Sequence, residues 1–218
     1  MYLPKHFAET DVAAMHALMR AHPLATVVHS GPQGLGANHL PLHLSTEPAP
    51  NGCLQGHVAR ANTLWKEAGP DAQVLVIFNG PEHYISPSSY ASKARDGRVV
   101  PTWTYIAVHA HGSIEAFDAQ NELLDHVGRL TSQNEEKRAE PWAVTDAPEK
   151  YLDAMTRAIV GIRMRVERIE GRWKLNQHKS DADRAGVVSG LAAEERAGAQ
   201  AISAQMQALE AARQAGER

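Results

Sequence analysis

Apolar and polar residues alternate along several short stretches of the chain, a pattern typical of β-strands. Within 35–44 every second residue from Leu40 to Leu44 is a leucine, and histidine or proline stands between them. Shorter strands are expected over 24–30 and 53–58, with a hairpin turn at 31–34. The apolar run 73–78 predicts a strand buried on both faces, followed by an irregular segment over 79–90.

A long alternating stretch covers 105–117, and a second one covers 161–177. The second stretch carries Gly171 near its middle, which predicts a hairpin that turns at this glycine. The polar segment 93–98 is expected to be a loop.

Other segments have apolar residues at helical spacing. A helix is expected after Thr10 as N-cap, and Pro23 should end it. Leucines and a valine form a helical stripe within 119–137, and Pro148 opens a further helix. The end of the chain, from Ser180 as an N-cap, is rich in alanine and glutamate and is expected to be helical.

Short antiparallel strands with few crossover helices predict a mainly β, α+β fold: a barrel with helical additions. No composition break marks an independent second domain, so we expect one barrel domain over 1–191 and a helical extension over 192–218. With 43% hydrophobic residues among 218, the chain can bury a substantial core.

Charge and cysteine content narrow the class of protein. A net charge of −3 argues against a protein covered in phosphate-neutralising lysines. Cys53 is the only cysteine, so no internal disulfide can form, and its place within a strand favours a buried filler over a nucleophile. The sequence shows no signal peptide and no membrane-length apolar run, which predicts a cytoplasmic protein without membrane contact.

Common nucleotide-binding and catalytic motifs do not occur. The sequence lacks a Rossmann glycine motif, a Walker A loop, H-E-x-x-H and G-x-S-x-G, and it has no convincing helix-turn-helix with a basic recognition helix.

Residues 56–62, GHVARAN, combine His57, Arg60 and Asn62 where a strand turns. An arginine fork and the exposed backbone N–H groups of a turn can hold a phosphate. The alternative is a solvated turn with a surface arginine.

Two further segments offer groups that suit a planar ligand. In VPTWTY, 100–105, Thr102 can hydrogen-bond a phosphate or a ring edge, and Trp103 is either a wall against a ring or ordinary core. Beyond the strand ending near 175, Lys174 and Gln177 could reach the pyrimidine edge of a flavin. Nearby acids and Arg184 read as helix capping with an ion pair.

His109 and His111 lie on one face of a strand at a spacing able to hold a metal. No further ligand is evident from the sequence, although other histidines could be near, and no metal site is predicted.

Six blocks occur in order along residues 1–191: MYLPKHF, ANHLPLHL, GHVARANTLW, VIFNGPEHYISPSSY, VPTWTYIAVHAHG and KLNQHKSDADRAGVVSGL. Together they resemble the PaiB-type family of FMN-binding negative transcriptional regulators. The resemblance implies an FMN-binding split β-barrel, pyridoxamine-phosphate-oxidase-like, in which FMN lies at a homodimer interface.

The resemblance also implies a set of cofactor-binding residues. It places His57, Arg60 and Asn62 near the phosphate, and puts the HLPL block along the ring. Thr102 and Trp103 would approach from the barrel wall. The full expected set is His39, Leu40, Pro41, Leu42, His57, Arg60, Asn62, Thr102, Trp103, Lys174, Leu175 and Gln177.

Two functions follow from the resemblance. The first is a homodimeric flavoprotein that acts in transcription regulation as a repressor, with promoter DNA as its partner. A strip of basic residues within 163–179 gives modest support for DNA contact, although such a strip is usually a solvated strand face. The alternative is a flavin-dependent oxidoreductase or a haem-handling protein on the same scaffold. No residue is compelling as a dedicated proton donor, so no catalytic residue is assigned and an enzyme is the less favoured interpretation.

Overall fold

The computed structural model describes residues 1–69 and 72–216, which form two compact units. The central unit comprises Asp11–Phe78 and Val108–Glu170, and the terminal unit comprises Met1–Thr10, Asn79–Ala107 and the chain from Gly171 onward. Strands β6 (Val74–Ile85), β7 (Thr102–Gly112) and β10 (Arg168–Lys174) contribute residues to both units.

Antiparallel strands form the sheets of the central unit. One sheet has four strands in the order β4-β5-β9-β8, and elsewhere β2 pairs with both β3 and β6. The bounds of these strands are β2 Leu24–Gly31, β3 Gly34–Pro41, β4 His43–Ser45, β5 Cys53–Ala59, β8 Ile114–Phe117 and β9 Ile159–Arg165.

The core of the central unit lies where the apolar faces of these strands meet. Leu40, Leu42 and Leu44 are all buried, as the alternation over 35–44 predicts. The strand itself breaks at Leu42, so that β3 and β4 belong to different sheets. Side chains from both sheets surround one small interior space: Val27, Leu42, Leu54, Val76, Ile114, Ile162, Arg163 and Met164.

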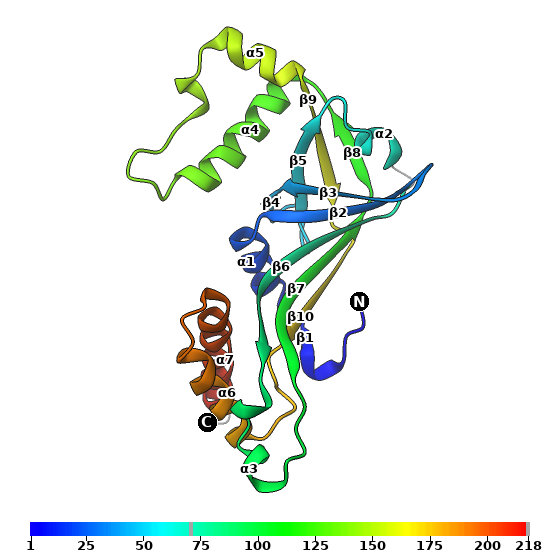
Figure 1. Ribbon diagram of the computed structural model, residues 1–218. Helices are drawn as coiled ribbons and strands as arrows, with labels where there is room; N and C mark the ends of the chain where they lie inside the picture. The colour runs from blue at the N-terminus through cyan, green and yellow to red at the C-terminus, as the bar shows by residue number, and fades with distance from the viewer. Residues whose placement is uncertain (70–71, 217–218) are drawn as a thin grey trace. The chain divides into compact units, whose positions relative to one another are not determined.

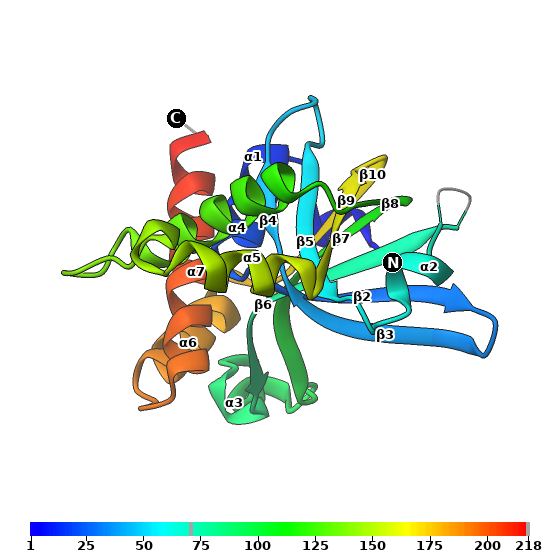
Figure 2. The same ribbon diagram turned by 90° about the horizontal axis from the view of Figure 1, so that it is seen from above.

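Helices flank the strands of the central unit. They are α1 Val12–Ala21, α2 Leu64–Glu67, α4 Gln120–Glu135, the short 3-10 helix η3 Val144–Asp146 and α5 Glu149–Arg157. Helices α4 and α5 contact each other and lie at an angle in both views (Figures 1 and 2). The N-cap of α1 is Asp11, whose side chain accepts from the Ala13 N–H, so the prediction of Thr10 as the cap is wrong by one residue. The helix ends before Pro23, as predicted.

The terminal unit joins both ends of the chain. Strand β1 (Ala8–Glu9) pairs with β10, and helices α6 (Asp181–Ala192) and α7 (Ala197–Gly216) pack side by side (Figure 1). Ser180 caps α6 by accepting from the Asp183 N–H, as predicted. The other elements of this unit are η1 Lys5–Phe7, η2 Pro87–Ser89 and α3 Ser92–Asp96.

Two predicted strand pairings are wrong. Strands β9 and β10 do not form the hairpin predicted over 161–177, because β9 pairs with β5 and β8 whereas β10 pairs with β1. Gly171 lies within β10 opposite Glu9, and the chain turns at Val166 and Glu167 instead. The stretch 105–117 likewise divides between β7 and β8 of different sheets.

Three local predictions in the region 73–98 also fail. Strand β6 is not buried on both faces, because Leu75 and Ile77 are partly exposed between buried neighbours. It also continues to Ile85, through the segment expected to be irregular. Most of the expected loop over 93–98 is helix α3, which ends at Gly97 in the left-handed region with φ 67°.

The predicted class, mainly β with flanking helices, is confirmed. No helix among the described residues combines the length and apolarity that crossing a membrane requires. The predicted division into 1–191 and 192–218 stays a prediction.

Candidate functional site

The HLPL block lies where β3 ends, in the central unit. His39 Nδ1 is 3.2 Å from the Thr26 hydroxyl, and the Leu42 N–H donates to the Pro23 carbonyl at 2.9 Å. Pro41 is exposed on β3, the last strand in its sheet order, where a residue without an N–H leaves no neighbouring strand without a hydrogen bond. Leu40 is buried, so the end of β3 can offer a ligand its backbone groups and the exposed imidazole of His39.

Arg60 follows β5 and has its guanidinium anchored on the backbone of a distant segment. Its Nε donates to the Arg157 carbonyl at 2.9 Å, its Nη2 to the Ile159 carbonyl at 3.0 Å, and its Nη1 pairs with Asp118 at 3.4 Å. A guanidinium has five N–H donors, so two remain beyond these three bonds. With its side chain 42% exposed, Arg60 keeps a positive charge and free donors at the surface of the central unit.

Asn62 holds the turn that carries Arg60. Its Nδ2 donates to Asn38 Oδ1 at 2.7 Å, and its Oδ1 accepts from the Leu64 N–H at 2.9 Å, just where α2 begins. The side chain of Asn62 therefore joins the turn to strand β3 and to α2.

His57 forms a pair with His126 that the sequence interpretation missed. His57 Nδ1 lies 3.1 Å from His126 Nε2, and the two rings meet edge to face with centroids 5.3 Å apart. Burial lowers the pKa of His57, and burial together with the positive form of His57 lowers the pKa of His126 to about 4. Both rings are consequently neutral near pH 7. The only signal in the sequence is that His126 lies on the helical stripe with Leu123 and Leu130.

In the terminal unit, Lys174 and Thr102 meet. The ammonium of Lys174 donates to the Thr102 hydroxyl at 2.8 Å, and burial, with help from Arg172, lowers the pKa of Lys174. Trp103 is 53% exposed, with its ring centroid 6.0 Å from that of Tyr84, so the interpretation of Trp103 as core is wrong.

Gln177 and Leu175 support the turn after β10. Gln177 Oε1 accepts from the Leu175 N–H at 2.8 Å, and its Nε2 donates to the Trp173 carbonyl at 2.5 Å. Leu175 is buried. The structure thus places seven of the expected cofactor residues in the central unit and the other five in the terminal unit. That they contact a flavin stays a prediction.

Glu170 brings a carboxylate to His109 and His111. One ligand atom from each of the three lies within 4.8 Å of the others, a neighbour that the sequence interpretation did not find. Glu170 Oε2 is 3.1 Å from His111 Nε2 and 2.7 Å from Arg168 Nη1. The guanidinium of Arg168 already balances the charge of this carboxylate.

Cys53 is half-buried, and burial raises the pKa of its thiol. A raised pKa disfavours the thiolate, which is the reactive form, in agreement with the interpretation of Cys53 as filler.

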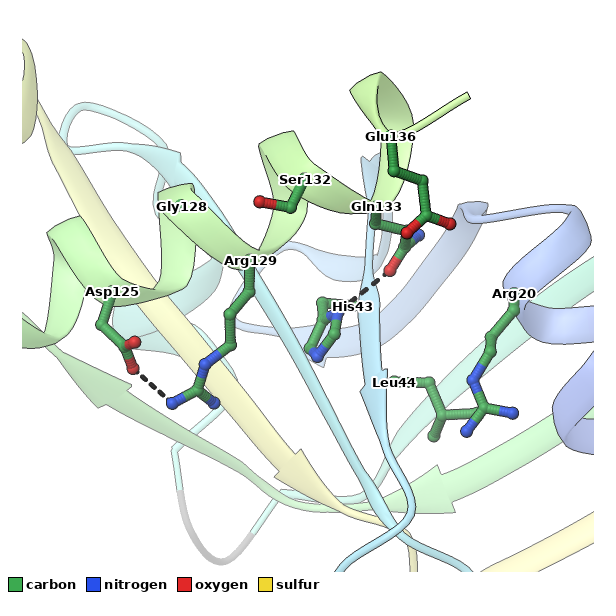
Figure 3. Close-up of a pocket in the computed structure, with 9 residues that line it drawn as sticks. All are labelled: Arg20, His43, Leu44, Asp125, Gly128, Arg129, Ser132, Gln133 and Glu136. Atoms are coloured by element: carbon green, nitrogen blue, oxygen red, sulfur yellow. Dashed lines mark hydrogen bonds and ion pairs between the residues drawn. The ribbon is translucent and has the colours of Figure 1, made fainter. Parts of the chain in front are cut away.

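A cavity of about 590 Å³ lies elsewhere in the central unit, and Figure 3 shows it. His43 Nδ1 is 2.9 Å from Gln133 Oε1, and Arg129 forms an ion pair with Asp125 one helical turn away on α4. None of the expected cofactor residues lines this cavity: it is bounded by Arg20, His43, Leu44, Asp125, Gly128, Arg129, Ser132, Gln133 and Glu136.

Comparison with known sequences gives one family and several relatives. Residues 1–168 match the family described as "Putative FMN-binding domain". The protease synthase and sporulation protein PAI 2 of Bacillus subtilis is 30% identical, with 95% of this chain and 97% of that protein covered. An uncharacterized protein of Emericella nidulans is 34% identical, with 88% of this chain and 90% of that protein covered.

Solved structures with a similar fold have much lower sequence identity. The FAD and heme binding protein from Mycobacterium smegmatis has a TM-score of 0.58 at 15% identity, covering 82% of this chain and 78% of that one. The flavocytochrome Anf3 from Azotobacter vinelandii has a TM-score of 0.54 at 14% identity, covering 82% and 75%. At these identities the likeness concerns the fold alone, and it agrees with the predicted split β-barrel with flanking helices.

Proposed function

Since the chain belongs to the FMN-binding domain family, as its resemblance to PaiB-type proteins predicts, we propose that it binds FMN as a homodimer and represses transcription. The observation that carries the flavin part is the family match over residues 1–168, which includes the turn with Arg60. FMN, when bound, supplies reversible redox chemistry, and the protein supplies position and charge.

The residues of the turn after β5 fit the phosphate of FMN. Arg60 is a partly exposed cation with two N–H donors left, and its other three donors hold it in one orientation. A guanidinium fixed in this way offers a phosphate charge-assisted hydrogen bonds at little entropic cost. Asn62 acts on the phosphate indirectly, by holding the turn.

Lys174, Thr102 and Trp103 fit the ring of a flavin. An ammonium with spare N–H donors beside a hydroxyl suits the carbonyl oxygens of the pyrimidine edge. The exposed indole of Trp103 offers a flat apolar surface for stacking.

The first test is a titration of the full chain with FMN, followed by flavin absorbance and fluorescence. We expect saturation at one FMN per subunit. Arg60→Ala should weaken binding by about 1.5–3 kcal/mol, or roughly 10- to 150-fold, because charge-assisted hydrogen bonds to the phosphate are lost.

Arg138→Ala is the matched control for this titration. Arg138 is also an arginine of the central unit, 66% exposed and ion-paired with Glu135, and its removal should leave FMN affinity unchanged. Because Arg60 also anchors backbone, thermal unfolding is measured for each variant. A folded Arg60→Ala protein with unchanged affinity would contradict the assignment of Arg60 to the phosphate.

The assembly and regulatory parts of the proposal rest on the family alone. Sedimentation equilibrium should give the mass of two chains, and a monomer at micromolar concentration would exclude the homodimer. We further propose that the protein is cytoplasmic, which agrees with its sequence and its single free cysteine.

Carboxylates balance part of the charge of the basic strip within 163–179. Arg163 pairs with Glu122, Arg168 pairs with Glu170, and Arg172 donates to the Tyr2 carbonyl. These contacts favour a solvated strand face, so DNA contact needs a direct test.

A gel-shift titration with promoter DNA provides that test. If the protein is a repressor, binding should appear at low salt and weaken steeply as salt is added, because each phosphate contact releases counterions. Absence of binding at 50 mM salt would contradict repression by direct DNA contact.

The alternative function is a flavin-dependent oxidoreductase or a haem-handling protein. Steady-state oxidation of NADH or NADPH by the FMN-loaded protein, with an added acceptor, distinguishes an oxidoreductase from a regulator. Rapid turnover would favour the oxidoreductase over the regulator.

A further inference from the structure

A second cavity, of about 250 Å³, lies wholly within the terminal unit. Of the residues around it, Thr102 and Lys174 alone belong to the expected cofactor set. Its lining consists of His6, Phe7, Tyr90, Val100, Pro101, Thr102, Lys174, Asn176, His178 and Lys179.

Asn176 is the most informative residue of this cavity. It is only 1% exposed, and neither its Nδ2 nor its Oδ1 has a hydrogen-bond partner among the described residues. A buried amide without partners costs about 1–3 kcal/mol, so such groups are usually satisfied by a ligand or by water. Asn176 also has φ 61°, a left-handed conformation that fixes its position in the turn after β10.

Tyr90 provides a second unsatisfied group. It is 3% exposed, and its hydroxyl is buried without a hydrogen-bond partner among the described residues. The ammonium of Lys179 lies over its ring, 5.2 Å from the centroid.

The cavity is cationic. Lys174 and Lys179 line it, and no carboxylate is among the lining residues. His6 and His178 also line it, with their rings 5.6 Å apart. A ligand with a negative charge would therefore balance the charge of these lysines. Lys174 uses one of its three N–H donors on Thr102 and keeps two for that ligand.

The walls and the size limit the rest of the ligand. Phe7, Tyr90 and Pro101 offer flat apolar surfaces, and the ring of His178 meets that of Phe7 edge to face at 5.5 Å. Pockets for drug-sized molecules are about 300–1,000 Å³, so this cavity suits a smaller molecule than a whole flavin nucleotide.

We propose that this cavity binds a small aromatic carboxylate, with the carboxylate between Lys174 and Asn176 and the ring against Phe7 and Tyr90. The cavity proposal stands on its own observations, but it assigns Lys174 to a carboxylate instead of the flavin ring, and the competition experiment below decides between these two assignments.

Isothermal titration of the full chain with benzoate, benzamide and acetate tests the ligand class. Benzamide keeps the ring without the charge, and acetate keeps the charge without the ring. We expect benzoate to bind one per subunit and at least tenfold more tightly than either. Equal affinity for all three, or no binding of benzoate, would overturn the proposal.

Two substitutions test the position of the ligand. Asn176→Asp keeps the shape and the left-handed preference but adds negative charge, and should weaken benzoate at least tenfold. Lys174→Gln should weaken it by a similar factor. Asn121→Asp makes the same charge change at an exposed position of α4 and should have no effect. Unchanged benzoate affinity in a folded Asn176→Asp protein would overturn the assignment.

A competition experiment separates this site from the flavin site. The benzoate titration is repeated with the protein saturated with FMN, and FMN is titrated alone. Unchanged benzoate affinity supports a separate site, whereas displacement of benzoate by FMN would make the cavity part of the flavin site and overturn the proposal. Failure of FMN to bind by itself would contradict only the proposed function.

Discussion

Asp183→Ala is expected to lower the free energy of unfolding by about 3 kcal/mol, and the melting temperature by roughly 6–12 °C. Asp183 is buried, and its Oδ1 accepts from the Ser92 N–H at 2.8 Å while its Oδ2 accepts from the Ser92 hydroxyl at 3.0 Å. Ser92 is buried as well, so the alanine variant leaves two donors without partners. This carboxylate joins helix α6 to the start of α3 within the terminal unit.

The charge of Asp183 makes this contribution dependent on pH. The backbone N–H of Ser92 lowers the pKa of Asp183 most; burial opposes this, and the hydroxyls of Ser92 and Ser180 add to it. Because the pKa is lower in the folded state than its usual 3.8, the stabilisation is complete above about pH 4. It decreases as the pH falls through the folded-state pKa.

Urea unfolding at pH 7 and at a series of lower pH values measures both effects. Asp183→Asn keeps an acceptor without the charge, so the difference between wild type and this variant should shrink below pH 4. Asp181→Asn is the control, since Asp181 lies on the same helix with its side chain 97% exposed and paired with Arg184. A loss as large in Asp181→Asn as in Asp183→Ala would contradict the explanation.

Gly161→Ala is expected to destabilise the protein by about 2 kcal/mol. Gly161 lies on β9 opposite His57 of β5 on one side and Phe117 of β8 on the other. A Cβ at this position would overlap the ring of Phe117, which lies over the residue. The ring of Phe117 has its centroid 6.1 Å from that of His126, so a displaced ring would also disturb the pair of His126 with His57.

The same substitution at Gly128 should change the free energy of unfolding in the opposite direction. Gly128 lies within helix α4, and a Cβ there would meet nothing within 4 Å. Alanine should stabilise this helix by about 0.5–1 kcal/mol through its higher helix propensity. Urea unfolding of both variants is therefore expected to differ by roughly 3 kcal/mol. Equal effects would show that the space at Gly161 is not limited by Phe117.

Residue types suited to flavin contact could be predicted from the sequence. Whether their polar atoms are free to bind a ligand or already bonded within the protein could not. Arg60 is a natural phosphate ligand on chemical grounds. The carbonyls of Arg157 and Ile159 are nearly a hundred residues away in the sequence. Only the fold brings them within hydrogen-bond distance of the Arg60 guanidinium, at 2.9 and 3.0 Å. Gln177 is likewise an amide in the expected segment, but both of its polar atoms bond to backbone.

The sequence by itself determined the elements that depend on interactions between residues close together in the chain. The strands over 24–30 and 53–58, the turn at 31–34, the helix within 119–137 and the cap at Ser180 all appear as predicted. In each case the deciding interactions join residues a few positions apart, through side-chain period, turn geometry or a capping hydrogen bond.

The tertiary structure decided which strands pair and which polar groups are buried. Alternation continues through 161–177, and it carries no information about partners, so β9 joins β5 and β8 while β10 joins β1. The contact of His57 with His126 and the unsatisfied amide of Asn176 depend in the same way on segments distant in sequence. Burial is a property of the packed chain, because each residue's neighbours are supplied by other elements.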